Sequence, residues 1–98
     1  MAELRWTREA EQWLKDIHEY IARENQVAAG KVVTGIYNKA QLVRDFPDLG
    51  HKYRSEPEGD VRIVYYGHYR IVYLSRTEGV IDILGVFHGA LDIERYFP

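Results

Sequence analysis

The feature that most constrains this chain is a block of three β-rich runs in its second half. The runs cover residues 61–66, 69–74 and 80–87, and short turns at Gly67-His68 and Thr77-Glu78-Gly79 separate them. Residues of this kind at this spacing predict an antiparallel meander. Both alternating sets of side chains in the first two runs are largely apolar or aromatic. A sheet with two apolar faces needs a cover on each face.

Two amphipathic helices come before the meander and predict the cover of one face. Apolar residues recur at spacings of three and four over residues 10–21 and again over residues 27–43. Thr7 is the expected N-cap of the first helix, which should end near Asn25, and Pro47 stops the second helix. Because the connection between the helices is short, they should run antiparallel as a hairpin.

The other segments complete the predicted fold. Residues 2–6 alternate apolar and polar side chains, which indicates a short strand. Residues 51–60 are polar with little periodicity, so we interpret them as a loop. The second face of the sheet needs either the segment 90–96 or a partner protein as its cover. The prediction is one α+β domain over residues 1–98, ordered β-α-α-β-β-β, with a mostly antiparallel sheet and a short C-terminal segment. Spacing alone does not determine the order of the strands in the sheet.

Composition limits the classes of function. The hydrophobic fraction of 46% and the charged fraction of 29% are typical of a globular protein. The absence of cysteine excludes disulfides and thiolate metal sites, and it is compatible with a reducing cytosol. A net charge of −2 argues against a general nucleic-acid clamp. No apolar run has the length of a signal peptide or a membrane span, so we expect a soluble, cytoplasmic protein with no membrane partner.

Three motifs stand out within the predicted order of elements. They are the turn Pro47-Asp48-Leu49-Gly50, the strand Tyr69-Arg70-Ile71-Val72-Tyr73 and the last run Ile83-Leu84-Gly85-Val86-Phe87-His88. In this order and spacing, they resemble the RelE/ParE superfamily, the toxins of type II toxin–antitoxin pairs. The resemblance spans almost the whole chain.

The superfamily has two known activities, and the resemblance is closer to the second. RelE-like members cut messenger RNA on the ribosome, whereas ParE-like members poison DNA gyrase without being nucleases. The Ala28-Ala29 helix opening, the turn at residues 47–50 and the length of the hairpin look closer to ParE. Residues 87–92 lack the basic residues that RelE-like nucleases usually place beyond the last strand.

The resemblance therefore implies a toxin that inhibits DNA gyrase, needs no catalytic residue or cofactor and is held inactive by a cognate antitoxin. The alternative is a RelE-like mRNA endonuclease that acts with the ribosome. A third interpretation is a degenerate member kept for antitoxin binding or transcriptional autoregulation.

Four residues are candidates for chemistry under the nuclease alternative: Arg70, Arg62, His88 and Tyr96. Metal-free RNA cleavage needs a proton acceptor, a proton donor and cations around the phosphate. Arg70 matches the family's strand arginine and either holds a phosphate or forms an ion pair with Asp82 or a terminal carboxylate. His88 is of a residue type that often transfers protons in catalysis, although we favour a hydrogen-bonding role at the strand end. Tyr96 aligns loosely with the aromatic residue that RelE-like enzymes use near the scissile phosphate.

The position of Arg62 depends on one residue of strand register. If Gly67-His68 forms a two-residue turn, Arg62 faces Tyr73 and Arg70 faces Tyr65, so the two arginines point to opposite faces. A three-residue loop would instead place both arginines on one side as a cationic pair.

Aromatic side chains crowd the first predicted hairpin: Tyr65, Tyr66, Tyr69 and Tyr73. Such rings stack on bases or bury area against a partner's helix. Because the chain has no strong positive field, we favour contact with a protein. The remaining histidines show no metal-ligand spacing, and we expect no metal site; they are His18, His51 and the turn residue His68.

Overall fold

The computed structural model describes residues 2–89 and 93–96, apart from the side chain of Glu94. Its elements are β1 (Glu3–Trp6), α1 (Arg8–Ala22), α2 (Gln26–Asp45), β2 (His51–Glu56), β3 (Gly59–Tyr66), β4 (Tyr69–Arg76), β5 (Val80–His88) and the short 3-10 helix η1 (Ile93–Arg95). The α+β class is confirmed, as is the order of the predicted elements. One strand, β2, is additional.

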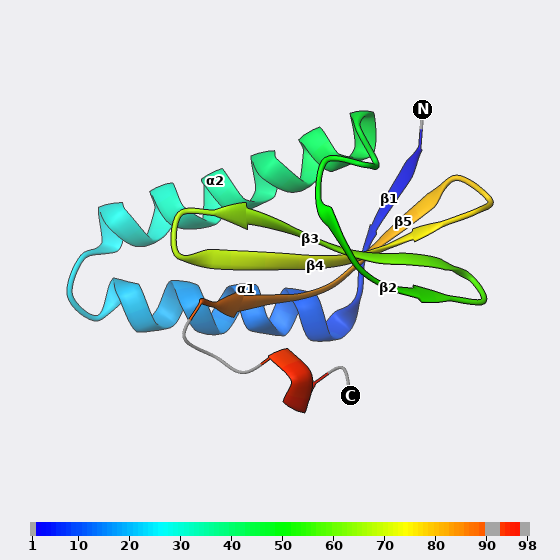
Figure 1. Ribbon diagram of the computed structural model, residues 1–98. Coiled ribbons are helices and arrows are strands. Elements are labelled where there is room, and N and C mark those ends of the chain that lie inside the picture. Colours follow the sequence, from blue (N-terminus) through cyan, green and yellow to red (C-terminus); the bar gives the residue numbers. More distant parts are fainter. Residues whose placement is uncertain (1, 90–92, 97–98) are drawn as a thin grey trace.

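The helical hairpin forms as predicted, and polar side chains cap both of its helices. The hydroxyl of Thr7 accepts a hydrogen bond from the backbone N–H of Ala10 at 3.1 Å. The side chain of Asn25 accepts one from the N–H of Ala28 at 2.9 Å, which starts α2. These caps satisfy N–H groups that have no partner within a first helical turn. Figure 1 shows α1 and α2 side by side and antiparallel along the sheet.

The five strands form one sheet in the order β1-β5-β4-β3-β2. β1 pairs in parallel with the first half of β5, from Glu3 opposite Val80 to Trp6 opposite Ile83. All other neighbouring strands are antiparallel. The first strand of the chain thus joins an edge of the meander, an order that local spacing does not determine.

The predicted loop at residues 51–60 is wrong, because most of this segment is the edge strand β2. It pairs with β3, from His51 opposite Ile63 to Glu56 opposite Gly59, with a bulge between Lys52 and Arg54. Backbone hydrogen bonds to β3 define the strand, while its side chains show no apolar alternation. Bulges and charged side chains are common on edge strands, where they oppose further strand pairing.

The turn between β3 and β4 has two residues. Tyr66 pairs with Tyr69, and Gly67 has a positive φ of 57°, a conformation that glycine adopts without steric cost. Arg62 pairs with Tyr73. The alternative with a three-residue loop is therefore wrong, and Arg62 and Arg70 lie on opposite faces of the sheet.

The hairpin covers one face of the sheet, here called the helix face. Its core is fully or almost fully buried and consists of Ala10, Ile36, Ala40, Val43, Val64, Ile71, Tyr73, Ile81, Ile83 and Val86. Gly35 brings α2 close to the sheet, since a Cβ at this position would overlap the hydroxyl of Tyr66. The helix face is thus a dense contact between two helices and four strands.

The C-terminal segment contributes to the cover of the second face. Ile93 of η1 is 4% exposed and packs in a cluster with Val61, Ile63, Val72, Leu74 and Phe87. Of the two covers that we considered for this face, the structure therefore includes the chain's own η1. In the described part of the chain, neither helix is both long and apolar enough to cross a membrane.

Candidate functional site

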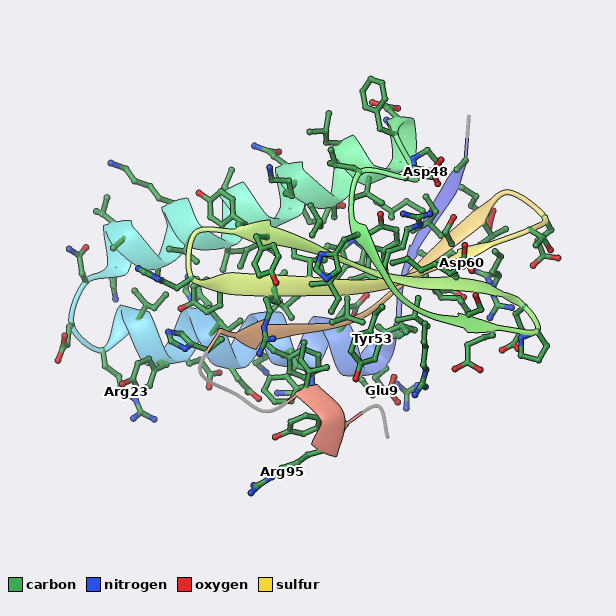
Figure 2. All side chains as sticks on the ribbon, viewed as in Figure 1. Glu9, Arg23, Asp48, Tyr53, Asp60 and Arg95 are labelled. Atoms are coloured by element: carbon green, nitrogen blue, oxygen red, sulfur yellow. The ribbon has the colours of Figure 1, made fainter. Side chains whose placement is uncertain are left out.

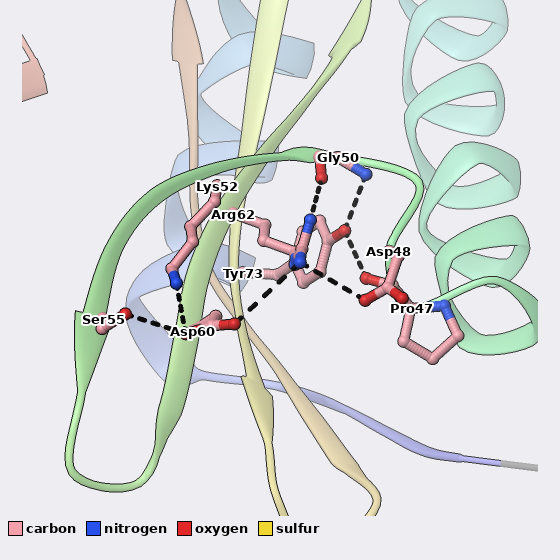
Figure 3. A network of polar contacts seen from close by, with 8 residues as sticks. All are labelled: Pro47, Asp48, Gly50, Lys52, Ser55, Asp60, Arg62 and Tyr73. Carbon is pink, nitrogen blue, oxygen red and sulfur yellow. Dashed lines mark hydrogen bonds and ion pairs between the residues drawn. The ribbon is translucent and has the colours of Figure 1, made fainter.

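The loop between α2 and β2, residues 46–50, is fastened to the sheet by a buried tyrosine (Figure 3). Tyr73 is fully buried, and its hydroxyl donates to the carbonyl of Pro47 at 2.7 Å. The same hydroxyl accepts from the N–H of Gly50 at 2.8 Å. Burial raises the pKa of Tyr73, although the Gly50 hydrogen bond and the charge of Arg62 oppose this rise. Tyr73 therefore stays neutral and is withdrawn from base stacking or partner contact.

Arg62 completes this network from the neighbouring strand. Its guanidinium donates to the carbonyl of Gly50 at 2.7 Å and lies 3.4 Å from the carboxylate of Asp48. A second carboxylate, that of Asp60, lies 3.9 Å away. The side chain of Arg62 is only 18% exposed. Arg62 thus helps to hold the loop 46–50 against the sheet.

Two further cations of the sheet lie on β2, in the segment that we took for a loop. The ammonium of Lys52 lies 3.6 Å from Asp60, and the guanidinium of Arg54 lies 2.6 Å from Glu56. The sequence held one signal for them, because charged residues at positions 52 and 54 around Tyr53 are compatible with an edge strand. The β2–β3 ladder thus carries three cations, each within ion-pair distance of a carboxylate.

Arg70 lies on the second face of the sheet, at the turn end of the β3–β4 hairpin, whereas Arg62 lies nearer the open end. It is opposite Phe87, and its guanidinium donates to the carbonyl of Gly89 at 3.3 Å. Three residues separate the pairs Arg62–Tyr73 and Tyr65–Arg70, which is roughly 10 Å along the strands. The structure therefore does not bring Arg62 and Arg70 to one phosphate-sized site.

Asp82, one of the partners that we considered for Arg70, is instead paired with two other arginines. Its carboxylate accepts from Arg5 at 2.8 Å and from Arg76 at 2.7 Å. Burial by itself would raise the pKa of Asp82, but the hydrogen bonds and charges of the two arginines outweigh it and lower the pKa. The trio joins β1, β5 and β4. The terminal carboxylate, the other partner that we considered, lies outside the described residues.

His88 ends β5 beside an apolar groove of about 560 Å³ between α1 and the sheet. Its ring meets that of Tyr69 edge to face, with centroids 5.5 Å apart, and stacks against His68 at 6.2 Å. Residues of α1, β4 and β5 line the groove: Trp13, Asp16, Ile17, Tyr20, Tyr69, Val86 and His88. Burial raises the pKa of Tyr69, which keeps its hydroxyl neutral. The groove is thus a largely apolar surface with a few polar atoms.

Tyr96 belongs to a cluster of three rings on the second face. It stacks on Phe87 with centroids 5.1 Å apart and meets Trp13 edge to face at 5.4 Å. Trp13 in turn meets Phe87 at 4.6 Å. Arg70 is the cross-strand partner of Phe87, so it lies on the same face of the sheet as this cluster.

The tyrosines of the β3–β4 hairpin lie in different environments. Tyr65 is 53% exposed and stacks on His51, whereas Tyr66 is half-buried against α2. In the described residues 2–89 and 93–96, no three metal-ligating side chains gather closely enough to hold an ion. What the molecule offers is a fastened loop at one end, an apolar groove along α1 and no single cluster of the four candidate residues.

Comparisons with known proteins agree with this arrangement. The chain is similar to a structure of the chromosomal ParDE toxin–antitoxin system from P. aeruginosa, with a TM-score of 0.71 and 22% identity over 90% of this chain and 96% of that one. It is also similar to a chain of the RelBE2 toxin–antitoxin complex from Mycobacterium tuberculosis, with a TM-score of 0.55 and 25% identity over 89% and 96% of the two chains. No curated protein matches it significantly. A family model described as the ParE toxin of the type II toxin–antitoxin system parDE matches residues 4–93. The chain therefore belongs to the ParE toxin family of type II toxin–antitoxin systems.

Proposed function

We propose that this toxin acts by binding and inhibiting DNA gyrase and that a cognate antitoxin neutralises it. The observation that supports an interaction rather than a cleavage reaction is that the cations on β2 and β3 are paired with carboxylates. Lys52, Arg54 and Arg62 each have a carboxylate of the same chain within ion-pair distance. A phosphate would have to displace these carboxylates before it met the positive charge.

Electrostatic requirements support the same reading. Stabilising the crowded phosphate of a cleavage reaction calls for several cations directed at one point. Arg62 and Arg70 are on opposite faces, and Arg62 also donates to a loop carbonyl. The net charge of −2 gives no long-range attraction for RNA. Inhibition by contact needs neither a proton donor nor a phosphate site.

The antitoxin has suitable surfaces in two apolar grooves along the hairpin. One is the groove of about 560 Å³ between α1 and the sheet. The other has about 540 Å³ and lies beside Trp6, Leu14, Val33 and Tyr37. Grooves of this kind accept an extended or helical segment that inserts apolar side chains at regular spacing. The two similar structures come from toxin–antitoxin systems.

Two assays on the purified protein test the proposal. We expect it to inhibit supercoiling of relaxed plasmid by bacterial DNA gyrase and to leave messenger RNA intact in a bacterial translating extract. Adding a cognate antitoxin should restore supercoiling. Cleaved message at ribosomal A sites without gyrase inhibition would overturn the proposal.

A second candidate function, ribosome-dependent mRNA cleavage, is favoured by one observation. Arg70 pairs with Phe87 across β4 and β5, and the ring of Tyr96 stacks on that of Phe87, so a cation and an aromatic hydroxyl both belong to the second face near the end of β5. His88 pairs with Tyr69 and therefore faces the other side of the sheet. A cation and an aromatic hydroxyl are group types that such cleavage uses. Under this alternative, Arg70→Ala with a preserved fold abolishes message cleavage.

A further inference from the structure

The end of α2 and the loop after it carry large apolar side chains that are open to solvent. Leu42 is 40% exposed, Phe46 is 60% exposed and Leu49 is 42% exposed. The N–H of Leu49 donates to the carbonyl of Phe46 at 2.9 Å, so the two residues belong to one tight turn. We call this surface, together with Asp45 and Asp48, the α2 knuckle. Exposed apolar side chains that gather in this way indicate an interaction site more strongly than single ones do.

The fold holds this knuckle in one conformation. The fully buried Tyr73 donates a hydrogen bond to the carbonyl of Pro47 and accepts one from the N–H of Gly50. Arg62 donates a hydrogen bond to the carbonyl of Gly50. A Cβ at Gly50 would also collide with the backbone of Ile63, so the loop is packed directly onto β3. Rigid presentation of exposed apolar groups lowers the ordering cost of binding.

Charge on the knuckle points to the chemistry of the partner. The side chain of Asp48 is 89% exposed, whereas that of its ion-pair partner Arg62 is 18% exposed. Asp45, at the end of α2, is also solvent-exposed, with 46% of its side chain accessible. Asp48 therefore presents its carboxylate to solvent beside the apolar centre, while Arg62 is largely covered. The complementary surface is an apolar pocket with lysine or arginine at its rim.

The position of the knuckle separates its partner from the antitoxin. The grooves along α1 are concave and suit an inserted segment, whereas the knuckle residues line neither groove and lie at the end of α2. Figure 2 shows Asp48 at this end, with Arg23 at the far end where α1 meets α2. An exposed apolar surface held in place in this way suits a partner with a pre-formed pocket, which a large folded enzyme provides. Enzymes that handle DNA also carry basic surfaces.

We propose that the α2 knuckle is the surface by which this toxin docks on gyrase, in an apolar pocket rimmed by basic residues. This inference rests on the function proposed above. Phe46 and Leu49 supply the buried contact, and Asp45 and Asp48 face the cations of the rim. Contacts of this type concentrate most of the binding energy in a few central apolar residues.

The test compares a double variant and a control variant with wild-type protein in the gyrase supercoiling assay. Phe46→Ala with Leu49→Ala removes the apolar centre, and Val27→Ala is the control. Val27 is 69% exposed in the first turn of α2, at the other end of that helix. We expect the knuckle variant to need at least about tenfold more protein for half-inhibition and the control to stay within about twofold of wild type. Circular dichroism and thermal melting verify that both variants are folded.

Each outcome bears on a different proposal. If wild-type protein inhibits gyrase and the knuckle variant inhibits it equally well, the docking surface is elsewhere and the gyrase function stands. If wild-type protein does not inhibit gyrase at all, the proposed function and the docking inference both fall.

A charge variant tests the basic rim independently of apolar packing and of any loss of folding in the first variant. Asp45→Lys with Asp48→Lys should weaken binding to immobilised gyrase at low salt at least about tenfold, because like charges then meet at the rim. The difference from wild type should shrink as salt screens the charges. Affinity equal to that of wild type at low salt would overturn the inference of a basic rim.

Discussion

The two faces of the sheet are almost equally apolar, yet the structure covers them in different ways. Two helices of 15 and 20 residues lie over the helix face and bury Ile36, Ala40 and Val43 of α2 completely. On the second face, the described side chains that add to the cover include Ile93 of the three-residue η1 and the adjoining ring of Tyr96. An apolar strand pattern thus reports that a cover exists without specifying its form. Because η1 is a much shorter element than α1 and α2, the two faces should respond differently to substitution.

The largest loss of stability should follow a truncation under the hairpin. Ile36→Ala removes a fully buried side chain from the core of the helix face, where neighbouring helices and strands limit collapse into the cavity. We expect the free energy of unfolding to fall by about 2–5 kcal/mol, as is usual for such truncations in a packed core. Chemical denaturation followed by circular dichroism measures it. A loss below about 1 kcal/mol would show that the helix face is not the rigid side of the molecule.

The same truncation on the second face should cost less. Ile93→Ala also removes a buried aliphatic side chain, but η1 is short and can resettle on the sheet. We expect a loss of about 1–3 kcal/mol, because the cost of a cavity depends on how well its surroundings collapse. Hydrogen exchange should show faster exchange in the neighbourhood of η1, with the hairpin amides little changed. A cost equal to that of Ile36→Ala would remove the distinction between the two covers.

The ion trio on the second face should give a smaller, pH-dependent effect. The pKa of Asp82 is lowered, so its contribution to stability is present above the ordinary carboxyl pKa and is lost as the pH falls through the lowered value. Asp82→Asn should therefore reduce the free energy of unfolding by about 1–2 kcal/mol near pH 7, where Arg5 and Arg76 lose a charged acceptor. The difference between the two proteins should shrink as the pH falls through the lowered pKa of Asp82. Denaturation at a series of pH values measures it, and a difference that persists in acid would contradict the assigned pairing.

The sequence predicted what local patterns control. Periodicity and capping residues located both helices, and the Gly67-His68 pair limited the register of β3 and β4 to two alternatives, of which the structure has the two-residue turn that separates Arg62 from Arg70. The strand β2 was missed because its pairing with β3 involves backbone groups and its side chains are mostly polar. Local patterns did not predict structure that depends on partners distant in the sequence.

The same limit applies to the candidate residues. Arg62 was predicted as a cation for chemistry, but its nearest partners are the Gly50 carbonyl and Asp48, which lie 12 and 14 positions away in a loop that only the folded chain brings close. Tyr73 was counted among the rings of an interaction surface, yet it is buried beneath the same loop. Residue type and strand position thus indicated polar side chains without determining their partners.

The smallest stability effect should come from Tyr96, and it also separates packing from chemistry. Its ring stacks on Phe87 and touches Trp13, while the residue is 46% exposed. Tyr96→Ala should lower the free energy of unfolding by about 0.5–1.5 kcal/mol through the lost ring contacts, whereas Tyr96→Phe keeps the ring and should cost almost nothing. Because inhibition of gyrase by contact needs no tyrosine hydroxyl at this position, Tyr96→Phe should also keep full toxicity in a growth assay. A folded Tyr96→Phe protein that has lost its toxicity would instead assign chemical work to the hydroxyl, and the lightly covered face would become the place to look for a nuclease site beside Arg70.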